Sequence, residues 1–426
     1  MANQCSAARA RLRYAPTPMD DTADMVIVGA GAAGLMAAVW AGRTRPGRRL
    51  LLLDGAGRLG AKILISGGGR CNVTHDQVDA SAFAGSSRNA IGKVLRRFDV
   101  PRTVAFFREI GVELKREQTG KLFPTTDQAR TVLNALLGAA VAAGALLLHP
   151  RRVETVTRTD GGFRVAGAWG SIAAPRVVLA TGGRSLPKTG SDGHGLELAR
   201  ALGHRPTEHI FPGLVALTLP PGHFIRELSG VTVPATVELW SGRGRRLESF
   251  TDSTLCTHLG LSGPSILDIS RYFLDARRAD PQALLTINWL PGVTAEELDR
   301  LLREPRASGP LAVLRPRLPD RLGRGLCREA GVDPALPLHR LTREARKLLA
   351  ATVTRLPLPI AGDRGFAHAE VTAGGVPLAE IRLETMESRV CPGLHLCGEI
   401  CDVDGRIGGY NFQWAWASGY TAGVSV

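Results

Sequence analysis

A glycine-rich turn near residue 30 places the strongest constraint on how this chain folds. The run Gly29-Ala30-Gly31-Ala32-Ala33-Gly34 has the spacing GxGxxG, between an apolar run from Asp24 and a helical pattern over Ala32–Arg43. Gly29 permits the tight turn, Gly31 lets the backbone approach a pyrophosphate, and Gly34 lets the helix pack closely on the strand. The turn therefore predicts a βαβ unit with a phosphate group at the positive end of its helix.

A second apolar run, Leu50–Asp54, ends on a carboxylate 20 residues past Gly34. At this position an acid can accept hydrogen bonds from the ribose hydroxyls of an adenosine. The same charge would repel the 2′-phosphate of NADP, which argues against NADP at this turn. The strand, turn, helix and acid follow in the expected order, so we predict dinucleotide binding. The choice between FAD and NAD depends on the rest of the sequence.

The net charge of +14 raises the question of a nucleic-acid partner. Of the 53 basic residues only six are Lys, so 47 are Arg, and they are spread along the chain without a block of five. On charge alone, a compositional preference for Arg explains this better than an RNA-binding face, and nucleic acid is not the favoured partner. No sequence feature specifies an oligomeric state.

The cysteines and apolar runs favour a cytoplasmic protein without a membrane segment. Seven Cys is an odd number, and residues 1–23 are polar, without the apolar core of a secretion signal; we expect them to form a disordered extension. The longest apolar stretch, Leu133–Leu148, has 16 residues, fewer than the roughly 20 that span a bilayer. No His, Cys or Asp spacing resembles a metal site, so no metal is expected.

Further along, the patterns alternate between α/β, β-rich and helical character. A glycine-rich loop is expected over residues 55–74, and short strands over 145–180. Residues 205–290 look β-rich, and residues 294–352 look helical, with Thr294 and Glu297 spaced as a capping box. A final helical pattern covers about Asn411–Ala422.

Five stretches of the sequence carry a resemblance to a known family. They are VIVGAGAAGLMAA from Val26, GAKILISGGGRCNVTH from Gly60, ATGGRSLPKTGSDGHG from Ala180, THLGLSGP from Thr257, and AEVTAGGV from Ala369 continuing into TMESRVCPGLHLCGEICDVDGRIGGYNFQWAWASGYTAG from Thr385. The chain resembles the BaiN-like bacterial NAD(P)/FAD-dependent oxidoreductases, also described as aminoacetone-oxidase-family flavoproteins. It departs from them in carrying Asp54 where Glu is more common, and in a compressed TGSDGHG loop.

The resemblance implies an α/β fold with a glutathione-reductase-like, FAD-binding Rossmann domain. An inserted β-barrel-like domain and a small helical subdomain would interrupt it. The expected division is 24–190 and 355–426 for the two parts of the FAD domain, 191–293 for the β-rich insert and 294–354 for the helical subdomain.

The resemblance also assigns expected roles around the flavin. The loop Ile65–Thr74 would pass alongside the ring, with Arg70 near the pyrophosphate or a substrate anion and Asn72 at the ring edge. Glu399 and Asp404 would accept hydrogen bonds from the ribityl chain, and the helix after Gly408-Gly409-Tyr410-Asn411 would direct its amides at the pyrimidine. The candidate cofactor-binding residues are Gly29, Ala30, Gly31, Ala33, Gly34, Asp54, Lys62, Ser66, Gly67, Gly68, Arg70, Cys71, Asn72, Val153, Thr181, Gly182, Gly398, Glu399, Asp404, Gly408, Gly409, Tyr410 and Asn411.

Several residues have a simpler structural interpretation. Cys71 has no resolving partner beside it, and Cys397 and Cys401 are interpreted as packing residues rather than redox or metal groups. Trp414 and Trp416 are expected in the core. Val153 contacts adenine only by analogy with the superfamily.

Candidate catalytic groups are His258 and Tyr410. His258 has a side chain suited to proton transfer near neutral pH, although a His bonded to the backbone in a turn explains it equally well. No second GxGxxG has a strand–turn–helix context, so either NAD(P)H docks transiently or the substrate itself reduces the flavin. The predicted function is an FAD-dependent oxidoreductase acting on a small organic substrate; the alternatives are a flavoprotein acting on RNA and an FAD-bound protein without turnover.

Overall fold

The computed structural model describes residues 21–304 and 307–426. Most of the predicted disordered extension, residues 1–23, lies outside this range. Its last residues do not fit the prediction, because Thr22 forms a parallel bridge to Ala173 and the Ala23 amide donates to the Ala173 carbonyl at 2.9 Å. The ordered chain therefore already joins the fold at Asp21.

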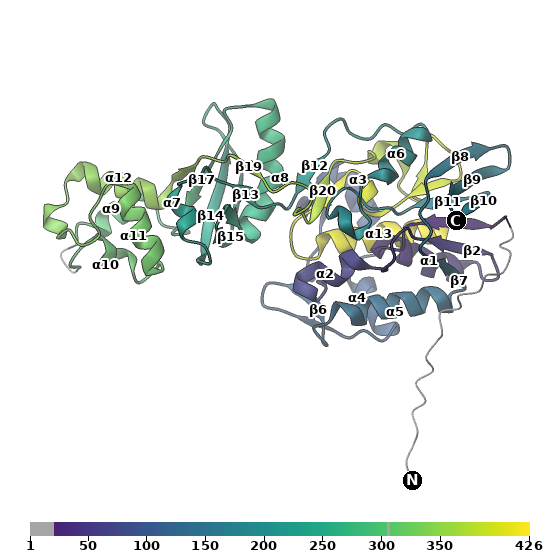
Figure 1. Ribbon diagram of the computed structural model, residues 1–426. Helices are drawn as coiled ribbons and strands as arrows, with labels where there is room; N and C mark the ends of the chain where they lie inside the picture. Colours follow the sequence, from purple (N-terminus) through teal and green to yellow (C-terminus); the bar gives the residue numbers. More distant parts are fainter. Residues whose placement is uncertain (1–20, 305–306) are drawn as a thin grey trace, which may run out of the picture.

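Three bodies lie in a row (Figure 1). A parallel sheet with helices on both faces forms one end, a β-rich part lies in the middle, and a group of short helices forms the other end. Two separate clusters of buried apolar side chains match this arrangement, one for the α/β part and one shared by the other two parts.

The α/β part is built on a seven-stranded sheet of order β21-β22-β23-β11-β1-β2-β7. The five strands from β23 to β7 are parallel, and β21 and β22 add antiparallel pairs at one edge. Strands β1, β2 and β11 are fully buried and apolar, as strands covered on both faces must be. The bounds are β1 (Met25–Val28), β2 (Leu50–Leu53), β7 (Ala145–Leu148), β11 (Val177–Leu179), β21 (Ile381–Arg382), β22 (Glu387–Ser388) and β23 (Leu394–Leu396).

The first and last helices pack against each other without intervening side chains. They are α1 (Ala32–Thr44) and α13 (Tyr410–Ser425). A Cβ at Gly419 would lie 2.5 Å from the Ala33 carbonyl oxygen, and one at Gly423 would lie 2.5 Å from that of Ala37. Only glycine allows this approach, which brings the two ends of the sequence together.

Smaller elements surround this sheet. The predicted glycine-rich loop 55–74 is wrong in part, because it contains α2, whose helical geometry breaks at Ser66, Gly67 and Gly68. The helices are α2 (Ala61–Gly69), α3 (Arg88–Leu95), α4 (Val100–Glu109), α5 (Ala129–Ala142) and α6 (His194–Ala201), with 3-10 turns η1 (Ala80–Ala82), η2 (Pro187–Thr189), η4 (Leu378–Glu380) and η5 (Gly398–Ile400). The strands are β3 (Thr74–His75), β4 (Phe83–Gly85), β5 (Leu114–Arg116), β6 (Lys121–Pro124), β8 (Thr155–Thr159), β9 (Gly162–Gly167), β10 (Gly170–Ala174), β12 (Phe211–Gly213), β20 (Val371–Ala373) and β24 (Val403–Gly405).

The middle part is a second seven-stranded sheet, of order β18-β17-β14-β15-β16-β13-β19, with every pair antiparallel. Its two edge strands are joined through residues 359–361 alone. This link reaches about 14 Å, whereas six strand spacings in a flat sheet cover about 29 Å. The sheet therefore curls until its edges approach, which confirms the barrel-like character. The elements are β13 (Leu217–Thr218), β14 (Thr232–Trp240), β15 (Arg246–Thr257), β16 (Gly260–Ser262), β17 (Leu284–Asn288), β18 (Leu356–Leu358), β19 (Gly362–Asp363) and α8 (Pro264–Ala279).

The helical part contains α7 (Phe224–Glu227), α9 (Ala295–Leu301), α10 (Pro310–Leu314), α11 (Asp320–Glu329) and α12 (Arg343–Thr354), with η3 (Leu338–Arg340). The capping box at the start of α9 is confirmed. The Thr294 hydroxyl accepts from the Glu297 amide at 3.2 Å, and the Glu297 carboxylate accepts from the Thr294 amide at 2.8 Å.

The two cores divide the chain differently from the sequence expectation of 191–293 and 294–354. Leu196 and Leu198 of α6 belong to the core of the α/β part, whereas β18 and β19 belong to the second sheet. The chain crosses between the parts at a two-stranded antiparallel ribbon of β12 and β20. The insert therefore spans about residues 214–370, which are the residues between β12 and β20.

The contact between α1 and α13 can be tested by replacing Gly with Ala at two positions, one inside the contact and one outside it. We expect Gly419→Ala to lower the free energy of unfolding by about 1–3 kcal/mol, because the new methyl overlaps backbone that cannot move independently. Gly138→Ala is the control: this glycine is exposed on α5 with nothing within 4 Å of the added methyl, and the change should stabilise by about 0.5–1 kcal/mol. Chemical denaturation of both variants provides the measurement, and similar unfolding free energies would contradict this packing.

Candidate functional site

The carboxyl ends of β1, β11 and β23 border a cavity of about 1060 Å³. Such an edge of an open parallel sheet is where α/β proteins bind ligands. The volume lies at the upper end of the roughly 300–1,000 Å³ typical of small-molecule sites. Residues from both ends of the chain line it, from Val28 to Ala415. The cavity is thus large enough for an extended dinucleotide.

Two long helices begin at this cavity with no side-chain cap. Gly31 is the N-cap of α1, and Gly409, with φ of 98°, is the N-cap of α13. By contrast, α4 is capped by Asp99, whose carboxylate accepts from an amide of the first turn. A Cβ at Gly31 would have nothing within 4 Å, so the space in front of α1 is open. Both helix ends can therefore offer free amides and positive dipole ends to an anionic group.

Asp54 is fixed by the turn itself. Its two carboxylate oxygens accept from the Ala30 and Ala56 amides, each at 2.7 Å, and the residue lines the cavity. Val153, which is 5% exposed, also lines the cavity. This arrangement leaves further carboxylate lone pairs for the ribose hydroxyls that the sequence predicts.

Two buried polar side chains on the cavity wall have an atom without a hydrogen-bond partner among the residues that the structure describes. Asn72 is 8% exposed with its Oδ1 atom unpaired, and Ser191 is 6% exposed with its hydroxyl unpaired. Buried polar atoms are almost always hydrogen-bonded, so these two indicate a polar ligand in the cavity. Gly67 and Gly68, with φ of 55° and 68°, keep the neighbouring backbone free of side chains. The residues present therefore fit a flavin dinucleotide.

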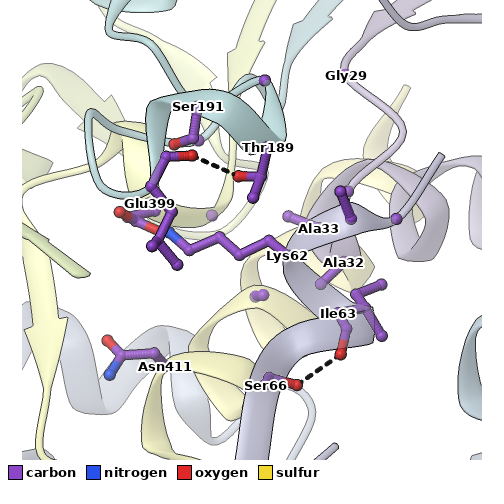
Figure 2. Close-up of a pocket in the computed structure, with 18 of the residues that line it drawn as sticks. Gly29, Ala32, Ala33, Lys62, Ile63, Ser66, Thr189, Ser191, Glu399 and Asn411 are labelled. Carbon is purple, nitrogen blue, oxygen red and sulfur yellow. Dashed lines mark hydrogen bonds and ion pairs between the residues drawn. The ribbon is translucent and has the colours of Figure 1, made fainter. Parts of the chain in front are cut away.

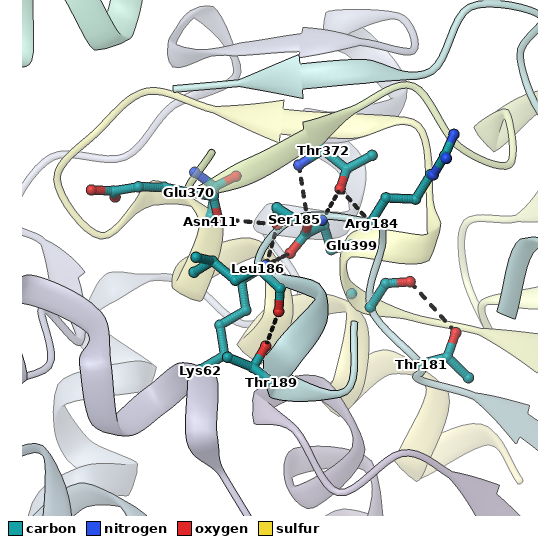
Figure 3. Close-up of polar contacts among 12 residues, drawn as sticks. Lys62, Thr181, Arg184, Ser185, Leu186, Thr189, Glu370, Thr372, Glu399 and Asn411 are labelled. Atoms are coloured by element: carbon teal, nitrogen blue, oxygen red, sulfur yellow. Dashed lines mark hydrogen bonds and ion pairs between the residues drawn. The ribbon is translucent and has the colours of Figure 1, made fainter. Parts of the chain in front are cut away.

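A compact polar cluster crosses the cavity beside α2 (Figure 2). Lys62 Nζ lies 2.5 Å from Glu399 Oε2 and donates to Ser185 Oγ at 2.5 Å. Ser185 in turn donates to Glu399 Oε1 at 2.7 Å, and the Thr372 amide donates to the same oxygen at 3.0 Å (Figure 3). The sequence predicted Lys62 and Glu399 but missed Ser185 and Thr372, although both lie within the matched stretches.

Arg70 lines the cavity, but its guanidinium is engaged by other side chains, whereas the sequence predicted that it would meet the pyrophosphate or a substrate anion. Its guanidinium pairs with Glu117 at 2.6 Å and lies 4.0 Å above the Phe123 ring. Lys121, on the same hairpin as Phe123, also lines the cavity, and its Cε would lie 3.4 Å from a Cβ at Gly408. Neither Glu117 nor Lys121 was predicted from the sequence, because neither belongs to a recognisable spacing.

Two predicted ligands prove to be interior residues. Asp404 is 5% exposed and outside the cavity lining; its carboxylate accepts from Arg271 Nε at 2.8 Å and Nη2 at 3.2 Å. Cys71 is fully buried, and burial raises the pKa of its thiol to about 12. Gly34 also lies outside the lining, because it packs against the Gly29 carbonyl as its helix-packing role requires.

Neither predicted catalytic residue lines the cavity. His258 is exposed between β15 and β16 in the insert, and its backbone carbonyl accepts from Arg226 Nε at 2.8 Å. The Tyr410 ring stacks on His75 with centroids 5.1 Å apart, and burial raises the pKa of its phenol. The remaining predicted residues, Gly29, Ala30, Gly31, Ala33, Lys62, Ser66, Gly67, Gly68, Thr181, Gly182, Gly398, Glu399, Gly408, Gly409 and Asn411, all line the cavity.

Other features of the described residues limit the chemistry. The six cysteines among them are buried and unpaired, and burial raises the pKa of Cys397 to about 12. Trp414 and Trp416 are buried and donate to the Gly398 and Val73 carbonyls. Within residues 21–304 and 307–426, no cluster of three acidic, His or Cys side chains could hold a metal, and no helix combines the length and apolar character of a membrane span.

The open space at Gly31 provides a direct test of the cavity. We expect Gly31→Trp to purify as folded but colourless protein, because the indole would fill the space before α1 where the diphosphate is predicted. Gly138→Trp, which adds the same side chain to an exposed helix surface, should remain yellow. Flavin absorbance and the melting temperature are the measurements. A yellow Gly31→Trp protein would refute this placement.

Comparison with known proteins agrees with this geometry. The model of the HI0933-like protein Rossmann domain matches residues 23–425. A ribosomal RNA dihydrouridine synthase of Escherichia coli is 34% identical over 93% of this chain and 96% of its own, and a 3-dehydro-bile acid delta(4,6)-reductase of Clostridium scindens is 32% identical over 93% and 97%.

A solved structure, the 3-ketosteroid delta1-dehydrogenase from Sterolibacterium denitrificans, has a TM-score of 0.51 at 14% identity, covering 95% of this chain and 99% of its own. At this identity the likeness concerns the fold alone. The family match, by contrast, spans nearly the whole chain and agrees with the cavity built at its glycine-rich turn. The chain belongs to the HI0933-like Rossmann family, a family of FAD-dependent oxidoreductases that includes the BaiN-type reductase.

Proposed function

We propose that this protein reduces a carbon–carbon double bond conjugated to a carbonyl group, using FAD reduced by a transiently docked NAD(P)H. The observation that carries the proposal is the charge arrangement on the cavity wall, where Lys62 and Lys121 both lie within electrostatic range of the Glu370 carboxyl. Cations can polarise a carbonyl, and a carboxyl group can supply a proton.

The names of two relatives support this reaction type. Dihydrouridine differs from uridine by saturation of a double bond conjugated to a carbonyl, and a delta(4,6)-reductase of a 3-dehydro-bile acid acts on such double bonds as well. The two substrates differ greatly in size, but the bond reduced is of one kind. This shared chemistry is the basis on which we extend the reaction to the present chain.

The cofactor's place is proposed from the site residues. Asp54 and Val153 would hold the adenosine, and the α1 amides after Gly31 would hold the diphosphate. FAD supplies a two-electron carrier when it is bound. Asn72 would bond the ring edge, and the uncapped amides of α13 after Gly409 would stabilise negative charge at the pyrimidine end.

The reductant can be tested by mixing anaerobic protein with NADH or NADPH in a stopped-flow instrument. We expect the flavin absorbance to bleach with at least one of them. Subsequent addition of a conjugated enone or uridine substrate, without oxygen, should restore the yellow colour. Bleaching by neither nicotinamide, or recovery with oxygen alone, would refute the proposed reductase.

RNA is a second candidate substrate, because two relatives, of Escherichia coli and Haemophilus influenzae, are named for ribosomal RNA. If RNA is the substrate, a ribosomal RNA transcript should restore the colour, and its binding should weaken steeply with salt. If a small enone is the substrate, an unsaturated 3-ketosteroid should restore the colour and RNA should not. Recovery rates with each probe, at two salt concentrations, distinguish the two candidates.

A further inference from the structure

We infer that Glu370 is the catalytic acid of this reduction and donates its carboxyl proton to the substrate carbon next to the carbonyl. The inference rests on the proposed function and identifies a residue that the sequence did not single out. Glu370 is in the matched stretch AEVTAGGV, directly before β20, where the chain returns from the insert.

Two hydrogen bonds hold the backbone of Glu370, while its carboxyl group has no hydrogen-bond partner among the described residues. Its amide donates to the Leu214 carbonyl at 3.2 Å, and its carbonyl accepts from Ser185 Oγ at 3.3 Å. Ser185 belongs to the cluster with Lys62 and Glu399 described above. In Figure 3 the Glu370 side chain extends away from that cluster, and the residue lines the cavity. The carboxyl group is therefore presented to a ligand by an anchored main chain.

The charged residues around the Glu370 carboxyl place it at the ring end of the cavity, which is the end where the flavin ring is predicted to lie. Lys62, Lys121 and Asp268 all act on the Glu370 carboxyl electrostatically. Lys121 lies against Gly408, and Asp268 accepts from the Ile407 amide at 2.7 Å, so both lie at the loop that leads into α13. The surrounding protein raises the Glu370 pKa, while the two lysines oppose that shift. Desolvation by the surrounding residues is the largest cause of this upward pKa shift, and Asp268 adds to it, although the Glu370 side chain is exposed at the cavity surface.

The other proton-bearing groups of the site are less suited to this role. Lys62 is engaged by Glu399 and Ser185, and Glu117 is paired with Arg70. His368 is engaged by Arg364, whose Nη2 lies 3.0 Å from its Nε2. Tyr410 lies outside the cavity lining. Of the carboxyl groups of Glu117, Glu370 and Glu399, only that of Glu370 has no hydrogen bond or ion pair to another described residue.

The proposed step balances in atoms and electrons. The substrate β-carbon accepts a hydride, whose electron pair comes from NAD(P)H through FAD, and the π bond between the two carbons breaks. The α-carbon forms a new C–H bond with the Glu370 proton. The resulting carboxylate is stabilised by Lys62 and Lys121 and takes a proton back from water. The net reaction consumes one nicotinamide hydride and one proton for each double bond.

Glu370→Gln separates this role from cofactor binding, because the amide keeps the shape but has no acidic proton. Reduced enzyme would be mixed anaerobically with an unsaturated 3-ketosteroid and, separately, with a ribosomal RNA transcript. With the probe that reoxidises the wild-type enzyme, we expect reoxidation of Glu370→Gln to be slower by about 10²–10⁴-fold. Its flavin content, its melting temperature and its rate of reduction by NAD(P)H should stay close to those of the wild type. Glu208→Gln, at an exposed side chain on the loop before β12, is the control and should behave as wild type.

The pH dependence gives a second readout that needs no variant. The acid acts only when protonated, so the wild-type reoxidation rate should be constant at low pH and fall as the pH rises through the raised Glu370 pKa. Glu370→Gln should lose this dependence, and Glu370→Asp should retain it at a lower rate.

Each outcome decides a separate question. Reoxidation of Glu370→Gln at the wild-type rate, or a wild-type rate that does not fall with pH, would overturn the role of Glu370 while leaving the reductase in place. A wild-type enzyme that reduces neither probe would overturn the proposed function, and this inference with it. If Glu370→Gln fails to fold or to hold FAD, the wild-type and Glu370→Asp pH profiles decide.

Discussion

The close contact between α1 and α13 is the constraint on which the site depends. Because Gly419 and Gly423 let α13 lie directly on the backbone of α1, the amino ends of both helices meet the same cavity. One end is suited to a diphosphate and the other to an electron-rich ring, and the two are separated in sequence by nearly the whole chain. A side chain between these helices would move the two positive ends apart and change the length of ligand that the cavity accepts.

The insert is joined to this site by two ion pairs with buried carboxylates, as well as by the β12–β20 ribbon. On α8, Arg271 pairs with Asp404 at 2.8 Å and Asp268 pairs with Arg406 at 3.1 Å. The first pair links the insert to β24, and the second links it to the loop between β24 and α13. A buried charge without its partner is costly, so these reciprocal pairs favour one position of the insert over the site. The same contacts explain why Asp404, which the sequence assigned to the ribityl chain, is not available to a ligand.

The sequence predicted the features that depend on residues close together in the chain, and it missed those that depend on residues far apart in the chain. The turn at Gly29–Gly34, the acid at Asp54 and the cap at Thr294 are local patterns with defined spacing, and the observed geometry follows each of them. The partner of Asp404 is 133 residues away, and no local pattern records such a pair. Ser185 was hidden for the same reason: its hydroxyl gains its place only when Lys62 and Glu399 meet across the fold.

The return strand β20 shows how one fold can host different substrates. The Thr372 amide donates to Glu399, whereas Glu370, two residues earlier, lines the cavity without such a bond to its carboxylate. In the proposed arrangement the cofactor contacts would come from the α/β sheet, while the wall that meets the substrate would come partly from the chain that leaves and re-enters the insert. Changes in the insert can alter the size of substrate admitted without disturbing the dinucleotide site. In the reduction proposed here, the reacting bond would need only the end of the cavity where the flavin ring is predicted, and the rest of the substrate would extend towards the insert.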